Sequence, residues 1–231
     1  MSAVPPSEVG ATTTAQSASV GHTTQSRLAA AAALRNLGNA VVAHSADDET
    51  LDRITAVAGE LLAAVSASAE RPHAFLEQGF EIFSHPPVEG RPARSRNAFP
   101  DCIVSGMANP LGMAARLWRE GEEAVCRVTL GPAFEGAPGR AHGGVVAALL
   151  DETMGLVLSI ASTPAFTGRL AVTYRAPTPV GEPLEVRARL AGRSGRKMTI
   201  TAAVSAAGRL LAEAEGLFIA VDPQRFVVLG P

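Results

Sequence analysis

Apolar and polar residues alternate with period two along most of the C-terminal half of the chain. This pattern is typical of strands that bury one face and leave the other exposed. It predicts six strands, at about 111–118, 124–130, 167–175, 183–192, 196–206 and 209–221. Gly121, Gly195 and Gly208 lie between neighbouring strands, where a glycine permits a tight turn.

One long apolar segment separates the second strand from the third. It begins at His142 and runs for about 18 residues, which is too long for an ordinary strand and predicts a helix. A helix that is apolar nearly all round has to be covered on most sides. The order of two strands, one helix and a meander of strands therefore predicts an α+β fold, in which a curved antiparallel sheet wraps a long central helix.

The N-terminal half has apolar residues at helical spacing instead. Two successive stripes predict a helical hairpin: Leu28, Leu34, Leu37, Val41 and Val42, then Leu51, Ile54, Val57, Leu61 and Val65. Residues 45–49 offer N-cap candidates and acids suited to the first turn of the second helix. This hairpin is expected to pack on the main domain or a partner subunit, or to act as a regulatory or docking element.

These patterns divide the chain into four parts. Residues 1–26 lack large apolar side chains and are expected to form a disordered tail. The helical hairpin extends over 27–70. A Pro-rich connecting segment follows over 71–110, where proline restricts regular structure. The sheet and its helix occupy 111–222.

Composition and charge exclude several classes of function. The net charge of −2 argues against a broadly basic nucleic-acid-binding protein. Lys197 is the single lysine, and the residues before it do not fit a phosphate-binding P-loop. Cys102 and Cys126 form no C-x-x-C pair, and no histidines are spaced to hold zinc. Neither a metal nor a cofactor is expected.

The expected location is the cytoplasm. No apolar run reaches the roughly 18–20 residues of a membrane span, and the N-terminus has neither the basic residues nor the apolar segment of a secretory signal.

Two features of the predicted central helix suggest chemistry. Asp151 lies in mid-helix among apolar neighbours, where a carboxylate is costly unless it has partners or a task. Gly143 and Gly144 open the helix, whose free N–H groups can stabilise negative charge on a carbonyl under attack. Gly143 and Asp151 are eight residues apart, about 12 Å along the helix, so one small carbonyl group cannot contact both in one chain. If both act on it, they come from different subunits.

Residues 110–221 resemble the hotdog-fold acyl-CoA thioesterases, in particular the phenylacetate-pathway-type (PaaI-like) branch of the 4-hydroxybenzoyl-CoA thioesterase superfamily. Three stretches carry the resemblance: FEGAPGRAHGGVVAALLDE (134–152), TGRLAVTYRAPTPVG (167–181) and GRSGRK (192–197). The hairpin, the Asn-Pro-Leu at 109–111 and the excess of arginine over lysine also look like actinobacterial members.

The resemblance implies a role for each matching residue. Asp151 is the acid that activates water or attacks the thioester, and Gly143 supplies the N–H that polarises its carbonyl. His142 shapes that end of the site, and Thr167 positions the water or the carboxylate. Several members carry Asn or Gln six residues before the histidine, where this chain has Gly136.

The resemblance also places substrate-binding groups. CoA is expected near Gly144 and the basic turn that contains Arg193, Arg196 and Lys197, because cations bind phosphates. Arg169 and Arg175 are alternatives. CoA would be part of the substrate, and the protein would be a homodimer or a dimer of dimers.

Two other readings of the sequence remain open. The first is a non-catalytic acyl-CoA-binding or sensor protein with the same fold. The second is a hotdog hydratase or dehydratase, although no Asp–His pair lies near Asp151 to support that chemistry. The acyl group is not specified by the sequence.

Overall fold

A six-stranded antiparallel sheet carries the fold. The computed structural model describes residues 24–71, 83, 86–91 and 99–222. Within them, the strands lie in the order β1-β2-β6-β7-β8-β5, with every neighbour antiparallel. Their bounds are β1 (Arg116–Glu120), β2 (Glu123–Thr129), β5 (Ala165–Tyr174), β6 (Pro183–Ser194), β7 (Lys197–Ala206) and β8 (Arg209–Ala220).

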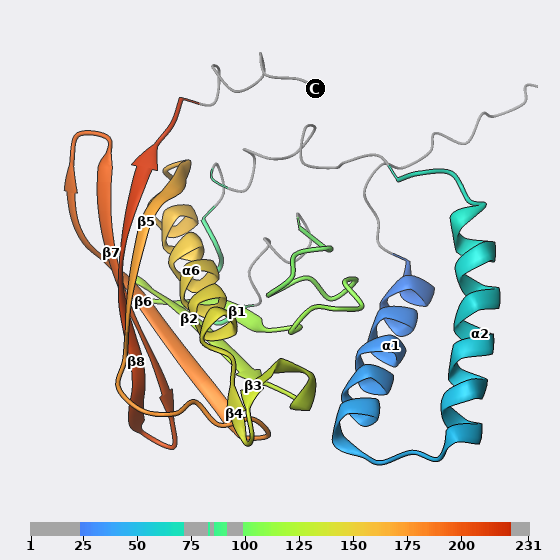
Figure 1. Cartoon of the computed structure of the whole chain (residues 1–231). Helices are drawn as coiled ribbons and strands as arrows, with labels where there is room; N and C mark the ends of the chain where they lie inside the picture. The colour runs from blue at the N-terminus through green and yellow to red at the C-terminus, as the bar shows by residue number, and fades with distance from the viewer. Residues whose placement is uncertain (1–23, 72–82, 84–85, 92–98, 223–231) are drawn as a thin grey trace, which may run out of the picture.

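The helix α6 (Gly143–Ile160) lies along the inner face of this curved sheet (Figure 1). It packs on β6, β2 and β7, and its buried side chains include Val146, Leu149, Leu150 and Met154. Strand β8 comes close enough that a Cβ at Gly216 would lie 2.8 Å from the Met154 sulfur. The predicted α+β architecture, with a sheet wrapped over one long helix, is confirmed.

By length and composition alone, α6 could cross a membrane. It has 18 residues and a mean hydropathy of 1.6, so the expectation that no apolar run is long enough is wrong. The acidic pair Asp151 and Glu152 does not offset the apolar residues around it. Half of the helix is buried inside the protein, and core helices of this kind pass the same test.

The four strands after α6 begin and end within two residues of their predicted bounds. Gly195 and Gly208 have φ of +57° and +78°, as tight turns require. The first strand is shorter than predicted, because it begins at Arg116 and not near 111. The N–H groups of Met113 and Ala115 donate to carbonyls of residues 103 and 104, so this stretch is tied to a loop instead of a sheet.

Two helices form the N-terminal hairpin, α1 (Gln25–Ala43) and α2 (Asp48–Ser66). Asp47, one of the expected candidates, caps α2 by accepting the Thr50 N–H. Helix α1 starts two residues inside the predicted tail, because the Thr24 hydroxyl caps it by accepting the Arg27 N–H. The rest of the tail, 1–23, and half of the predicted connecting segment lie outside the described residues.

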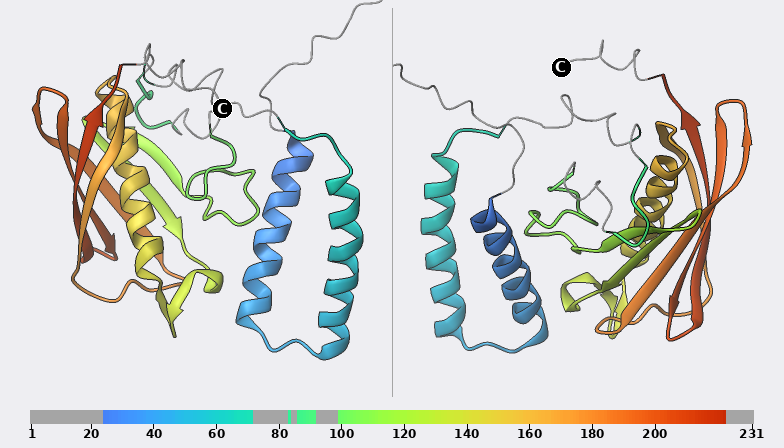
Figure 2. Two further views of the ribbon diagram at one scale, coloured as in Figure 1. Left: turned by 45° about the horizontal axis from the view of Figure 1, so that its top comes forward. Right: turned by 180° about the vertical axis from the view of Figure 1, so that it is seen from behind.

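The hairpin is attached to the body through α1. In Figures 1 and 2, α1 lies between α2 and the rest of the molecule. Arg35 donates to the carbonyls of Met107 and Asn109 at 3.0 and 2.7 Å. Arg27 and Arg71, near the two ends of the hairpin, both pair with Asp101 at 2.8 Å. One carboxylate therefore connects both ends of the hairpin to the loop that precedes β1.

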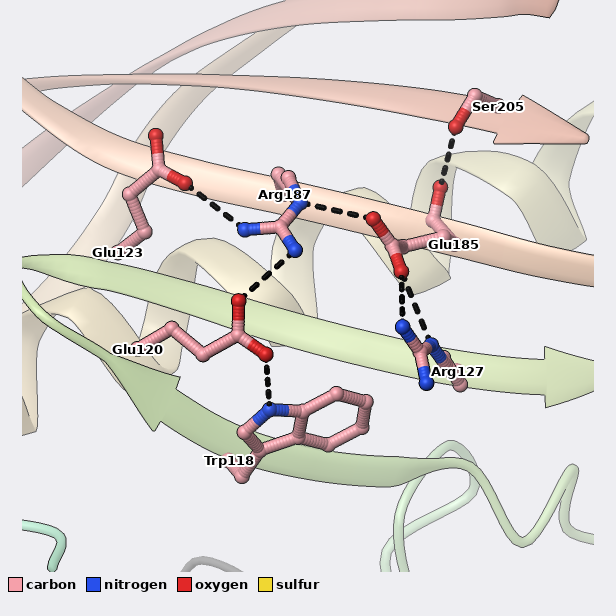
Figure 3. Close-up of polar contacts among 7 residues, drawn as sticks. All are labelled: Trp118, Glu120, Glu123, Arg127, Glu185, Arg187 and Ser205. Atoms are coloured by element: carbon pink, nitrogen blue, oxygen red, sulfur yellow. Dashed lines mark hydrogen bonds and ion pairs between the residues drawn. The ribbon is translucent and has the colours of Figure 1, made fainter. Parts of the chain in front are cut away.

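The outer face of the sheet is polar near its β1 edge (Figure 3). Arg187 on β6 pairs with Glu120, Glu123 and Glu185, and Arg127 on β2 pairs with Glu185. The hydrogen bond from Arg127, assisted by Arg187, lowers the pKa of Glu185 despite partial burial. These ion pairs connect β6 with both β1 and β2, and so help to hold the three strands at this edge of the sheet together.

The attachment of the hairpin should depend on pH. Burial raises the pKa of Asp101, but hydrogen bonds from Arg27 and Arg71 outweigh it, so the net pKa is lowered. The stabilisation is therefore present above the ordinary carboxyl pKa of about 4 and is lost as pH falls through the lowered value. We expect Asp101→Asn to reduce the melting temperature near neutral pH and to match wild type at strongly acidic pH. Asp52→Asn, on exposed α2, is the control. A difference that does not change with pH would contradict the prediction.

Candidate active site

Asp151 and Thr167 form the acidic end of the site. The Thr167 hydroxyl on β5 donates to Oδ1 of Asp151 on α6 at 2.9 Å. Asp151 is half-buried and Thr167 is exposed, so the carboxylate is held in place and remains accessible. A carboxylate in this position can accept a proton or attack an electrophile. The structure thus brings together two residues that the sequence placed 16 positions apart.

The N-terminus of α6 forms the second part of the site. His142 is the N-cap residue, and its Nδ1 accepts the Gly144 N–H at 3.0 Å. This bond engages the N–H of Gly144, which was expected to contact the ligand. The Gly143 N–H makes no hydrogen bond within the described part of the chain. Histidine is an uncommon N-cap, so composition alone could not reveal this role.

A shallow cavity opens beside Gly143. Tyr174, the last residue of β5, donates from its hydroxyl to the Gly143 carbonyl at 2.7 Å. The cavity measures about 360 Å³ and is lined by Arg140, Ala141, Gly143, Val146, Tyr174, Arg175, Ala176, Pro177 and Thr178. It combines an apolar wall with two arginines next to the helix N-terminus. Sequence analysis missed Arg140 and Tyr174 and gave Arg175 as an alternative, because only the fold brings these segments to Gly143.

The basic turn lies at the other end of α6. Arg193 donates to the hydroxyl of Thr163, just beyond the C-terminus of the helix, and Arg196 donates to the Ala220 carbonyl. Lys197 begins β7 and is exposed. Since 18 helical residues span about 27 Å, these cations are far from Gly143 of the same chain.

Gly136 packs directly against the cap residue. A Cβ at this position would lie 2.7 Å from the Cα of His142. The neighbouring Glu135 accepts the Gly139 N–H and is used within the β3–β4 turn, where β3 is Glu135–Ala137 and β4 is Arg140–Ala141. Asn or Gln would not fit at position 136, because no side chain can be placed there without a shift of the backbone.

A second carboxylate beside Asp151 serves the fold. Glu152 accepts hydrogen bonds from the buried hydroxyl of Ser105 and, at 3.5 Å, from the thiol of Cys102. These bonds hold the loop that precedes β1 against α6.

Cys126 on β2 is buried, and burial raises the pKa of its thiol to about 12. A thiol with that pKa stays protonated near neutral pH and is a poor nucleophile.

Among the described residues, no group of three or more His, Cys, Asp or Glu side chains is arranged to hold a metal ion.

Comparison with known proteins identifies the fold. Residues 138–215, from the β3–β4 turn to β8, match the Thioesterase superfamily. A solved structure described as a thioesterase superfamily protein superposes with a TM-score of 0.69 at 24% identity, covering 87% of this chain and 93% of that one. The protein therefore has the hotdog fold.

Curated relatives match shorter segments. The acyl-coenzyme A thioesterase THEM4 of Bos taurus is 29% identical over 127 residues, which are 53% of this chain and 52% of that protein. THEM4 of Mus musculus is 33% identical over 94 residues, 40% of each chain. THEM5 of Mus musculus is 43% identical over 60 residues, 26% of this chain and 24% of that one. This chain thus spans about half, or less, of the length of these relatives.

The close approach at Gly136 predicts the result of a minimal substitution. Gly136→Ala should destabilise the protein by about 1–3 kcal/mol, because the added methyl overpacks against the His142 backbone. Gly192→Ala is the matched control, since a Cβ there meets nothing within 4 Å. Denaturant unfolding measures both variants. If the two variants have equal free energies of unfolding, the β3–β4 segment accommodates the methyl group without loss of stability, and the prediction is wrong.

Proposed function

We propose that this protein hydrolyses an acyl-CoA thioester to a free acid and CoA. The observation that carries the proposal is the Asp151 carboxylate, which Thr167 holds and which is accessible. The same helix has at its N-terminus a Gly143 N–H that makes no hydrogen bond to any described residue. The names of the relatives, acyl-coenzyme A thioesterases, support this chemistry and this class of substrate.

The reaction needs a base for water and a donor for the carbonyl oxygen. In the proposed mechanism, water attacks the thioester carbon and Asp151 accepts its proton. A backbone N–H at the N-terminus of α6 donates to the carbonyl oxygen as negative charge develops. The C–S bond then breaks, and the proton held by Asp151 passes to the departing sulfur. The products are the free acid and CoA, with Asp151 again ionised.

A second route uses Asp151 as the nucleophile. Its carboxylate attacks the thioester carbon, CoA leaves, and water hydrolyses the resulting anhydride. In single-turnover hydrolysis in H₂¹⁸O, label in the Asp151 carboxylate identifies the second route. The general-base route leaves Asp151 unlabelled, whereas attack of water on the Asp151 carbonyl of the anhydride transfers the label to that carboxylate.

We propose that the complete site is shared between two copies of the chain. Strand β5 is an edge of the sheet, is ten residues long and has mostly exposed side chains. An edge strand of this kind readily pairs with another strand. Two-fold pairing along β5 would set two α6 helices side by side and antiparallel. The N-terminus of one would then approach Asp151 of the other, which bridges the roughly 12 Å that separates Gly143 from Asp151 in one chain.

The carboxylate is tested directly. Asp151→Asn keeps the shape of the side chain and removes its basicity, so we expect kcat to fall about 10²–10⁴-fold on a panel of acyl-CoAs. Glu122→Gln, which is exposed in the β1–β2 turn, is the control. Thiol release measures turnover, and calorimetry measures CoA binding. If Asp151→Asn turns over as fast as wild type, Asp151 is neither the general base nor the nucleophile. CoA binding without turnover in the wild type would favour a binding or sensor protein instead.

Sharing between subunits is tested by complementation. Gly143→Pro removes the N–H at the first helical position, where proline is favoured, and His142 already has the extended conformation that precedes proline, with φ −62° and ψ 138°. We expect Gly143→Pro and Asp151→Asn each to be nearly inactive as separate proteins. Mixed dimers should regain one intact site each, made of Gly143 from one subunit and Asp151 from the other. Mixtures that stay inactive after subunit exchange would show that each site lies within one chain.

A further inference from the structure

Asn39 connects the N-terminal hairpin to the segment that leads into α6. Its Oδ1 accepts the Ala133 N–H at 3.1 Å, in the short 3₁₀ helix η1 (Pro132–Phe134). Its Nδ2 donates to the Arg35 carbonyl, one turn earlier in α1, at 2.9 Å. Because the donor end of the amide is bound within α1, the acceptor end is held toward η1.

The chain makes room for this contact at Gly131. A Cβ there would lie 2.0 Å from Oδ1 and 2.6 Å from Cγ of Asn39. Gly131 has φ −83° and ψ 174°, an extended conformation that alanine also adopts. The backbone conformation therefore does not require glycine at 131, whereas the approach of Asn39 does.

The contact continues from η1 to the candidate site. The Phe134 carbonyl, at the end of η1, accepts the His142 N–H at 2.9 Å. His142 in turn caps α6 through the Gly144 N–H. Asn39 is thus connected through η1 and His142 to the N-terminus of α6, where the carbonyl of the substrate is proposed to bind.

Helix α1 is also connected, through the loop before β1, to the acidic end of the site. Arg35 holds the carbonyls of Met107 and Asn109, in the loop that carries Ser105. Ser105 donates to Glu152, the neighbour of Asp151. The same helix therefore contacts the segments that support both ends of the site.

We infer that Asn39 is a positioning residue for this site: it holds η1 and, through η1 and His142, fixes the N-terminus of α6. The N-terminal hairpin is then part of the catalytic architecture. The catalytic consequence rests on the proposed thioesterase function, whereas the contact itself can be tested without it.

The kinetic test compares two asparagines of α1. Asn39→Ala should lower kcat at least about tenfold while KM changes less than about twofold, because a displaced N–H weakens the transition state more than substrate binding. Asn36→Ala, on the exposed face, should behave as wild type. Asn39→Asp keeps an oxygen that can accept the Ala133 N–H but loses the Nδ2 donor to the Arg35 carbonyl, so it should restore only part of the lost kcat. Full activity of Asn39→Ala would overturn the inference.

A double substitution tests the contact with Gly131. Gly131→Ala alone should lower kcat about as much as Asn39→Ala, because its methyl would collide with the Asn39 amide. In the double variant that amide is absent, so kcat should equal that of Asn39→Ala alone. Effects that multiply would mean that the two residues act independently and would overturn the inference. Gly131→Ala disturbs the same contact without removing Asn39, so the inference can still be tested if Asn39→Ala folds poorly.

Hydrogen exchange gives a readout that does not require activity. In Asn39→Ala, amides in the peptide from 131 to 146 should exchange faster than in wild type and in Asn36→Ala, with α2 unaffected. Unchanged exchange there would overturn the positioning role even if turnover fell. Faster exchange in a protein whose wild type hydrolyses no acyl-CoA would support the contact and refute the proposed function instead.

Discussion

The structure depends on covering one apolar helix. Most of α6 cannot face water without a large cost, and a single layer of strands can cover it only by curving around it. Six strands do so, and the close approach at Gly216 shows how tightly the sheet lies against the helix. The position of the sheet follows from this packing. The N-terminus of the helix opens on a cavity, and its middle carries Asp151.

Three successive polar residues in the middle of this helix each have a hydrogen-bond partner. Glu152 accepts hydrogen bonds from Ser105 and Cys102 in a loop, and Thr153 is buried but donates to the Leu149 carbonyl. Asp151 differs, since its partner Thr167 lies on an exposed edge strand and leaves the carboxylate accessible. A buried polar group with every bond satisfied serves the fold, whereas one that retains access can also serve chemistry. This contrast separates two adjacent acids that look alike in the sequence.

The N-terminal hairpin contributes more than covered surface. Its α2 has no buried residue, while α1 provides Arg27 and Arg35 to the loop before β1 and Asn39 to η1. These hydrogen bonds have defined partners and lengths, whereas most apolar side chains of α2 are exposed. The hairpin is therefore attached by polar contacts at defined points, and these points lie on the segments that lead to the two ends of the candidate site.

The sequence by itself determined the elements, and the tertiary structure decided their connections. Alternation with period two and turn glycines are local signals, so the four strands after α6 were placed within two residues. The apolar segment from His142 predicted α6, and in the structure Asp151 on that helix accepts a hydrogen bond from Thr167. The cap by His142, the cavity with Arg140 and Tyr174, and the Asn39–Ala133 bond depend on residues that only the fold brings together. For residues 111–115, hydrogen bonds to a loop overrode the alternating pattern, since backbone groups need partners but not necessarily a sheet.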